Sequence, residues 1–203
     1  MDRTIETDPK EANPRTPGAS PRKKRQTFIF QILIAIGLLA AVWFSFGHNV
    51  LSPQTPGGPP KKFLEMELAS VVEGKQALAQ VNELHGTDLG LGTAYIAEYS
   101  HAFNPYHGSN NEKLTVWVGK AENSQAAAAL LNRMRQGIEK GGSPFSKPEQ
   151  ITVAGQEIFH VDGPNSETNF FYHSPVKGED VVWLTIMSSS DPRAILEEAL
   201  KTF

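Results

Sequence analysis

Two segments decide the fold: TVWVGKAENSQAAAALLNRM at residues 115–134 and VVWLTIMSSSDPRAILEEAL at residues 181–200. They align without a gap, so that Trp117 matches Trp183. Each begins with strand-forming residues and ends with apolar residues at helical spacing. The pair therefore predicts two copies of a strand–strand–helix unit. The half-repeats extend over about 72–142 and 150–203.

Further strand and helix signals surround these segments. We predict strands at 93–100, 113–120, 150–154, 156–162, 168–174 and 180–187. A first helix extends from Val72 to His85 and ends at Gly86, a glycine cap. The later helices begin at the N-caps Ser124 and Asp191. Residues 63–203 are thus expected to form one α+β domain, with a mainly antiparallel sheet and the helices on one face.

Trp117 and Trp183 allow two interpretations. They are either a platform for a ligand or matched core anchors at the points where each strand meets its helix. Because both lie on apolar strands, we favour core anchors.

A second decisive stretch, TFIFQILIAIGLLAAVWFSF at 27–46, precedes the domain. As a helix it reaches roughly 30 Å, the thickness of the hydrocarbon core of a bilayer. A cleaved signal peptide has a shorter apolar region that ends at small residues, whereas this stretch ends with bulky aromatics such as Trp43. Trp43 suits the membrane interface. We therefore predict an uncleaved, single-pass transmembrane signal-anchor.

The first 26 residues are rich in proline and charge, so we predict a disordered basic tail. Its last basic cluster comes directly before the span and consists of Arg22, Lys23, Lys24 and Arg25. Such a cluster binds lipid headgroups or, as we favour, keeps this end of the chain in the cytoplasm. The C-terminal domain is then extracytoplasmic.

Small residues recur every four positions within the span, at Gly37, Ala41 and Ser45. This stripe allows two helices to approach closely and form a homodimer. The alternative is that small residues recur here by chance, because they are common in membrane helices. After the span, residues 47–62 are rich in proline and glycine and predict a linker between membrane and domain.

Charge and composition exclude several functions. The chain has a net charge of −3, and since the tail is basic, the remainder is distinctly acidic. An acidic domain argues against nucleic acid as a partner. The chain has no cysteine, which excludes disulfides, thiolate metal sites and cysteine nucleophiles.

The candidate binding residues are all weak. His85 and Asp88 lie at a polar turn after the first helix, and His101 and His107 flank the aromatic loop HAFNPYH. A structural interpretation competes for each: His85 places a charge near a helix C-terminus, and the others are loop residues.

Histidines also raise the question of a metal or haem site. His160 and His173 lie on consecutive predicted strands and would pair across a hairpin, although sheet-face histidines without a ligand give the same pattern. The cofactor stays unknown. Ser174-Pro175-Val176-Lys177 has the letters of an SxxK acyl-transfer motif, but it lies in a predicted hairpin turn rather than at a helix start.

These features favour a non-catalytic interaction module that is tethered to the membrane and binds another envelope protein. The alternatives are a ligand- or metal-binding carrier, as an accessory subunit of an envelope complex, and a hydrolase without a recognisable motif. The strand-pair-then-helix ending over the last fifty residues or so resembles extracytoplasmic domains of membrane-anchored bacterial proteins. This resemblance implies a sensor or interaction module and assigns no site residue.

Overall fold

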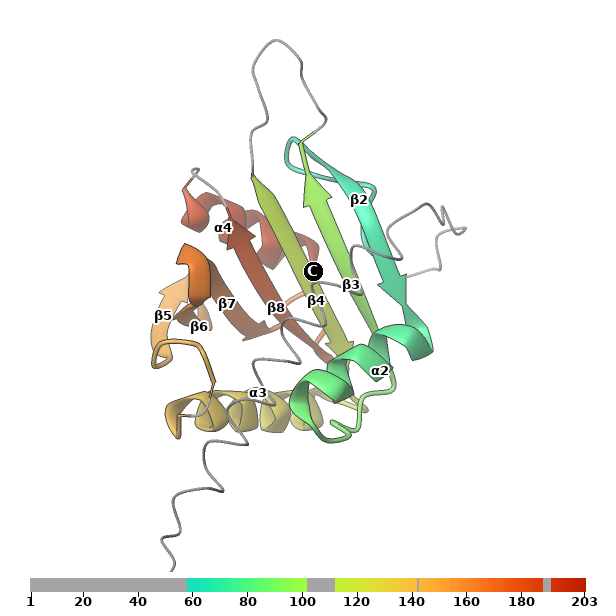
Figure 1. Cartoon of the computed structure of the whole chain (residues 1–203), viewed down its shortest axis with the longest axis vertical. Helices are drawn as coiled ribbons and strands as arrows, with labels where there is room; N and C mark the ends of the chain where they lie inside the picture. The colour runs from blue at the N-terminus through green and yellow to red at the C-terminus, as the bar shows by residue number, and fades with distance from the viewer. Residues whose placement is uncertain (1–57, 102–111, 142, 188–190) are drawn as a thin grey trace, which may run out of the picture.

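The computed structural model describes residues 58–101, 112–141, 143–187 and 191–203. Eight strands form one sheet in the order β1-β2-β3-β4-β8-β7-β6-β5, and all neighbours are antiparallel (Figure 1). The strands are β1 (Lys62–Phe63), β2 (Met66–Glu73), β3 (Thr93–Ser100), β4 (Lys113–Lys120), β5 (Glu149–Val153), β6 (Gln156–Asp162), β7 (Thr168–His173) and β8 (Asp180–Met187). The helices are α2 (Gly74–His85), α3 (Ser124–Glu139) and α4 (Pro192–Thr202), with a short 3-10 turn η1 (Pro164–Ser166). The predicted α+β class is confirmed.

The predicted tail, anchor and most of the linker lie outside the described residues. This applies to Arg22, Lys23, Lys24, Arg25, Gly37, Ala41, Trp43, Ser45 and also His107. In the parts of the chain that are described, none of the helices combines the length and apolar character that a membrane crossing requires. The anchor at 27–46 and dimerisation through its small residues therefore stay predictions.

Strand β2, near the edge of the sheet, was not predicted. Met66–Glu73 is strand β2, and Val72 pairs with Ile96 instead of opening the first helix. The helix begins at Gly74, whose φ of 63° turns the chain out of the strand. Two adjacent β-branched residues, Val71 and Val72, favour the extended conformation before that turn.

The ordered domain also begins earlier than predicted. Pro59 is buried, and the hydroxyl of Tyr99 donates a hydrogen bond to the carbonyl of Pro60 at 3.0 Å. Lys61 accepts from the amide of Leu68 at 2.9 Å. These contacts place the last residues of the expected linker in the domain.

The helices cover both faces of the sheet, so the prediction that they share one face is wrong. The front face carries α2 and α3, which contribute Ala77 and Leu130 to two small apolar clusters (Figure 1). The back face carries α4, whose buried Leu196 joins the large core together with Phe203, the residue that follows the helix. Strand β8 explains the difference, because its residues are apolar on both faces and each face needs a cover.

The strands of the two predicted half-repeats are arranged symmetrically in the sheet, but their helices are not. Strand order is symmetric about the β4–β8 pair, in which Trp117 lies opposite Trp183. The following helices, α3 and α4, lie on opposite faces, which a two-fold axis perpendicular to the sheet does not produce. Internal duplication stays a prediction.

The helix caps are largely as predicted. Asp191 caps α4 by accepting from the amide of Arg193 at 2.9 Å, and Gly86 ends α2 in the left-handed conformation. For α3 the cap is Asn123 rather than Ser124, because the Asn123 side chain accepts from the amide of Ala126 at 2.9 Å.

Candidate functional site

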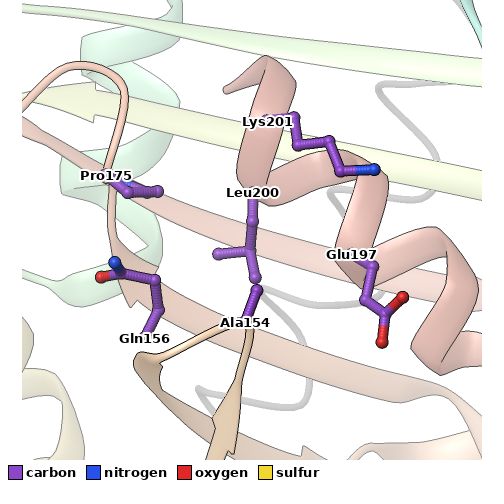
Figure 2. A pocket seen from close by; sticks show the side chains of 6 residues that line it. All are labelled: Ala154, Gln156, Pro175, Glu197, Leu200 and Lys201. Atoms are coloured by element: carbon purple, nitrogen blue, oxygen red, sulfur yellow. The ribbon is translucent and has the colours of Figure 1, made fainter.

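A pocket of about 390 Å³ opens on the back face beside α4 (Figure 2). It lies between α4, the turn that joins β5 to β6, and the turn that joins β7 to β8. Its lining consists of Ala154, Gln156, Pro175, Glu197, Leu200 and Lys201. The pocket is a shallow surface recess that is more open than enclosed, unlike the cavities that bury most of a small ligand.

The pocket combines apolar and polar groups. Leu200 is only 4% exposed and belongs to the core, whereas Glu197 and Lys201 stand one helical turn apart and are exposed. Each charge already has a partner on α4: Glu197 contacts Arg193 at 3.2 Å, and Lys201 contacts Glu198 at 3.0 Å. Exposed pairs of this kind are weak, so a ligand can replace them.

The turn beside the pocket is strained. Ala154 and Gly155 have φ values of 50° and 80° and connect Val153 to Gln156, the geometry of a two-residue type I′ hairpin. Glycine adopts this conformation freely, whereas alanine does so at a cost of about 1 kcal/mol. The chain therefore keeps an unfavourable residue where the turn meets the pocket.

The predicted turn at His85 and Asp88 is a local structural unit. The His85 Nδ1 donates to the carbonyl of Val81 at 2.8 Å within the helix. Asp88 accepts from the amide of Gly90 at 2.9 Å, and Asn82 donates to Asp88 at 3.3 Å. Because these contacts close the turn itself, they assign no ligand to it.

His101 is the described half of the second predicted pair. Its Nε2 lies 2.8 Å from a carboxylate oxygen of Glu112, across the ends of β3 and β4. His107 lies outside the described residues, so convergence of His101 with His107 stays untested.

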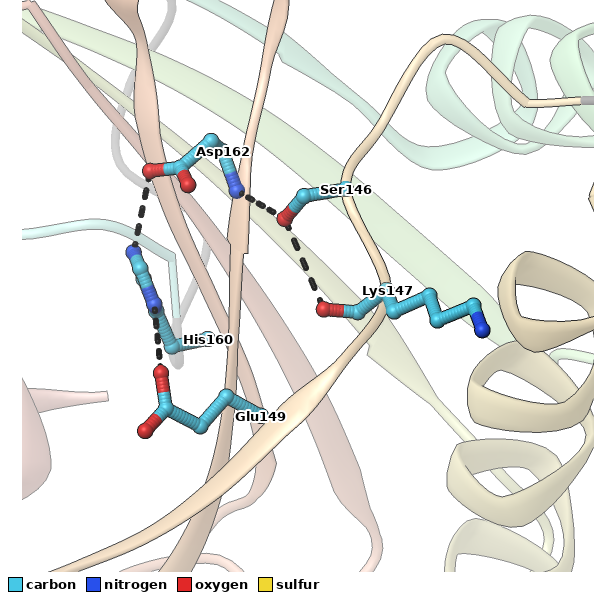
Figure 3. Close-up of polar contacts among 5 residues, drawn as sticks. All are labelled: Ser146, Lys147, Glu149, His160 and Asp162. Atoms are coloured by element: carbon cyan, nitrogen blue, oxygen red, sulfur yellow. Dashed lines mark hydrogen bonds and ion pairs between the residues drawn. The ribbon is translucent and has the colours of Figure 1, made fainter.

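His160 sits between two carboxylates (Figure 3). Its Nδ1 is 3.8 Å from Glu149 and its Nε2 is 3.5 Å from Asp162. The Asp162 amide donates to the Ser146 hydroxyl at 2.8 Å, which fixes the neighbouring loop. Both carboxylates are largely exposed, so the arrangement resembles a surface ion-pair network.

The prediction that His160 and His173 pair across a hairpin is wrong. His160 lies opposite Phe170 on the back face, whereas His173 lies opposite Val181 on the front face. Side chains alternate between faces along a strand, which separates the two imidazoles. His173 Nε2 instead donates to the carbonyl of Gly178. Across the described residues, no group of three or more His, Asp or Glu is placed to hold a metal ion.

The SxxK letters form a hairpin turn, as expected. The Ser174 hydroxyl donates to the carbonyl of Phe203 at 2.6 Å and accepts from the amides of Val176 and Lys177. Ser174 is buried, and its hydroxyl fastens the turn to the end of α4.

The tryptophans lie at the centre of the front face, away from the strand–helix junctions. Trp183 stacks on Phe171 with ring centroids 5.1 Å apart, and Phe145 packs on it at the same distance. Trp117 packs with the cluster under α2. Both tryptophans are therefore packing residues. The prediction that they lie where each strand meets its helix is wrong.

Buried polar groups lie on the back face. Burial raises the pKa values of Tyr95 and Tyr172, and it raises the pKa of Asp180 against the opposing charges of Lys177 and Lys120. Among the described residues, the Tyr172 hydroxyl and one Asp180 carboxylate oxygen find no hydrogen-bond partner. These groups weaken the core locally.

Sequence reasoning missed the pocket. Its residues come from three separate segments of the chain, and only Glu197 and Lys201 share a detectable i,i+4 spacing. The pocket exists because α4 packs on the back face, where the β5–β6 turn meets it.

Comparisons with known proteins add little. No protein-family model matches the chain, and no curated protein matches it. Among solved structures, it is similar to the extracellular domain of PknH from Mycobacterium tuberculosis, with a TM-score of 0.35 and 9% identity. The match covers 68% of this chain and 81% of that one. A likeness of this size assigns no function to this chain.

Proposed function

We propose that this chain is a membrane-tethered, extracytoplasmic binding module without catalytic activity, whose back-face pocket takes a peptide segment of another envelope protein. The observation that supports this proposal is the make-up of the pocket, which places an apolar floor beneath an amide and charges of both signs. The carrier and hydrolase alternatives gain no comparable site from the described residues.

A peptide fits the pocket group by group. Leu200 and Pro175 offer apolar contact to one side chain, and the Gln156 amide can both donate to and accept from a peptide unit. Glu197 and Lys201 select charged neighbours at the rim. Because the rim charges are weakly paired on α4, binding replaces exposed pairs rather than buried ones.

The membrane topology forms the first part of the proposal and has its own test. The absence of cysteine makes single-cysteine labelling clean. In intact cells, a membrane-impermeant maleimide should label Lys75→Cys on the exposed start of α2 but not Thr4→Cys in the tail. Labelling of Thr4→Cys alone would overturn the orientation, and release of the chain by alkaline washing would overturn the anchor.

The pocket has a separate test. A photo-crosslinking amino acid at Gln156 of the full chain, in native membranes, should give one discrete adduct with another protein. The same group at Lys75, on the opposite face of the sheet, should not. Lys201→Glu should abolish the Gln156 adduct, whereas the same charge change at Lys75 should leave it intact. No adduct from Gln156, or equal adducts from both positions, would reject peptide binding in this pocket.

A further inference from the structure

The two edges of the sheet are built differently. At one edge, β1 has two residues and covers only Met66 and Glu67 of β2. The pairing of β2 is interrupted by a register shift between Leu68 and Ser70. Short strands and bulges are common ways to protect an edge from pairing with another chain.

The opposite edge lacks such protection. All five residues of β5 pair with β6 in continuous register, and no described strand pairs with the outer side of β5. Residues 149–153 contain no proline, glycine, lysine or arginine. Gln150 and Thr152 are exposed, whereas Ile151 packs against the core. This edge is regular and able to accept another strand.

The hairpin turn determines which backbone groups point outward. A two-residue turn makes Val153 and Gln156 a hydrogen-bonded pair. Hydrogen-bonded and non-hydrogen-bonded pairs alternate along an antiparallel ladder. The N–H and C=O groups of Ile151 therefore also form hydrogen bonds with β6. The outward N–H and C=O groups therefore belong to Gln150 and Thr152.

We propose that β5 is the pairing edge for a second copy of this chain, with the two strands antiparallel and centred on Ile151. In this register Gln150 of each copy lies opposite Thr152 of the other, and four backbone hydrogen bonds form. Ile151 lies opposite itself and extends the apolar back face. Glu149 lies opposite Val153, so no carboxylate of the strand faces another. The interface is the same patch on both copies, as a two-fold dimer requires.

The expected interface is small. A stable complex in solution buries about 800 Å² per partner, and one five-residue strand supplies much less. This step rests on the membrane anchor of the proposed function, because tethering in the same membrane raises the local concentration of the two copies and favours such a weak contact. The test therefore uses the full chain in native membranes.

The experiment is disulfide crosslinking, with no native cysteine to interfere. Opposed residues of a non-hydrogen-bonded pair have Cα atoms about 4.5 Å apart, which is within reach of a disulfide. On mild oxidation, Ile151→Cys should give a homodimer that reducing agent splits. Ala69→Cys, on the protected edge, should stay monomeric.

Two further tests separate the proposed register from chance collisions and from misfolding. Thr152→Pro removes an outward N–H without disturbing the ladder with β6, so it should abolish the Ile151→Cys dimer while the circular dichroism spectrum is kept. Chains with Gln150→Cys should crosslink to differently tagged chains with Thr152→Cys. A folded Ile151→Cys chain that stays monomeric, or joins only another protein, overturns the proposal. A dimer that survives Thr152→Pro, or forms equally through Ala69→Cys, overturns it as well.

Discussion

The two faces of the sheet differ in how far their apolar surface extends. On the back face, three successive rows across β3, β4 and β8 are apolar, and a single core joins them to α4. The front face has a row with Ile96, Trp117 and Trp183, followed by a row with Glu98, Thr115 and Thr185. The change from apolar to polar residues marks where the cover by α2 and α3 ends.

The polar front row still forms its own contacts. Ser70 donates to Glu98 at 3.0 Å, and Lys113 contacts the same carboxylate at 2.6 Å. At the other end, Thr185 donates to Asn169 at 2.8 Å. Stability should therefore be concentrated on the back face, whereas smaller apolar clusters and hydrogen bonds hold the front face.

The largest expected effect compares the same substitution on the two faces. Leu196→Ala removes a fully buried side chain of α4 from the large core and should lower the free energy of unfolding by about 4 kcal/mol. Leu130 of α3 belongs to a smaller cluster, which can close more of the cavity left by a truncation. Leu130→Ala should therefore lower the free energy of unfolding by only about 2.5 kcal/mol. Equilibrium urea unfolding of residues 58–203 measures both. Equal losses in the free energy of unfolding would contradict the conclusion that the back face contributes more stability than the front face.

The second prediction concerns the two tryptophans of the front face. The Trp183 indole N–H donates to Asn169 at 3.2 Å and to Thr185 at 3.1 Å. Trp183→Phe leaves Asn169 without this donor and should cost about 1–2 kcal/mol beyond the loss of ring area. Trp117 makes no side-chain hydrogen bond to a described residue, so Trp117→Phe is the matched control and should cost less. The reverse order in urea unfolding would mean that the front face depends on ring packing alone.

The third prediction tests the carboxylate on the apolar back face. Because burial raises the pKa of Asp180 in the folded state, its contribution to stability is full below the unfolded pKa and is lost as pH rises through the folded one. Asp180→Asn should therefore raise the urea midpoint at pH 7, and the gain should shrink toward pH 3. Glu179 is the control of opposite sign, because its hydrogen bond and ion pair with Lys120 lower its pKa. Glu179→Gln should not stabilise at pH 7, and a pH-independent gain for Asp180→Asn would exclude titration as its cause.

Local patterns predicted most of the fold. The strands at 93–100, 113–120, 156–162 and 180–187 match the structure, because their composition follows from burial on one or both faces. Strand β2 was missed because the irregularity between Leu68 and Ser70 breaks its alternation. The faces of α3 and α4 could not be predicted, since similar strand–helix segments leave β4 and β8 in opposite directions.

The pocket was unpredictable for the same reason. Gln156 and Lys201 are separated by more than forty residues and meet only because α4 packs on the back face. The two histidines depend on register as well. Side chains alternate between the faces along each strand, so the observed pairing of the strands places His160 and His173 on different faces. Register, which depends on the whole sheet, was the missing information.

The smallest expected effect lies at the turn that joins the back-face pocket to the β5 edge. Ala154 and Gly155 both have positive φ, but only glycine adopts such angles without strain. Ala154→Gly relieves the strain and loosens the unfolded chain, and these opposing terms should leave a net gain of a few tenths of a kcal/mol. A Cβ at Gly155 would meet nothing within 4 Å, so Gly155→Ala tests backbone strain without a clash and should cost about 1 kcal/mol. If urea unfolding showed Ala154→Gly to be destabilising, the Ala154 methyl group would have to contribute packing at the pocket that exceeds the strain of its backbone.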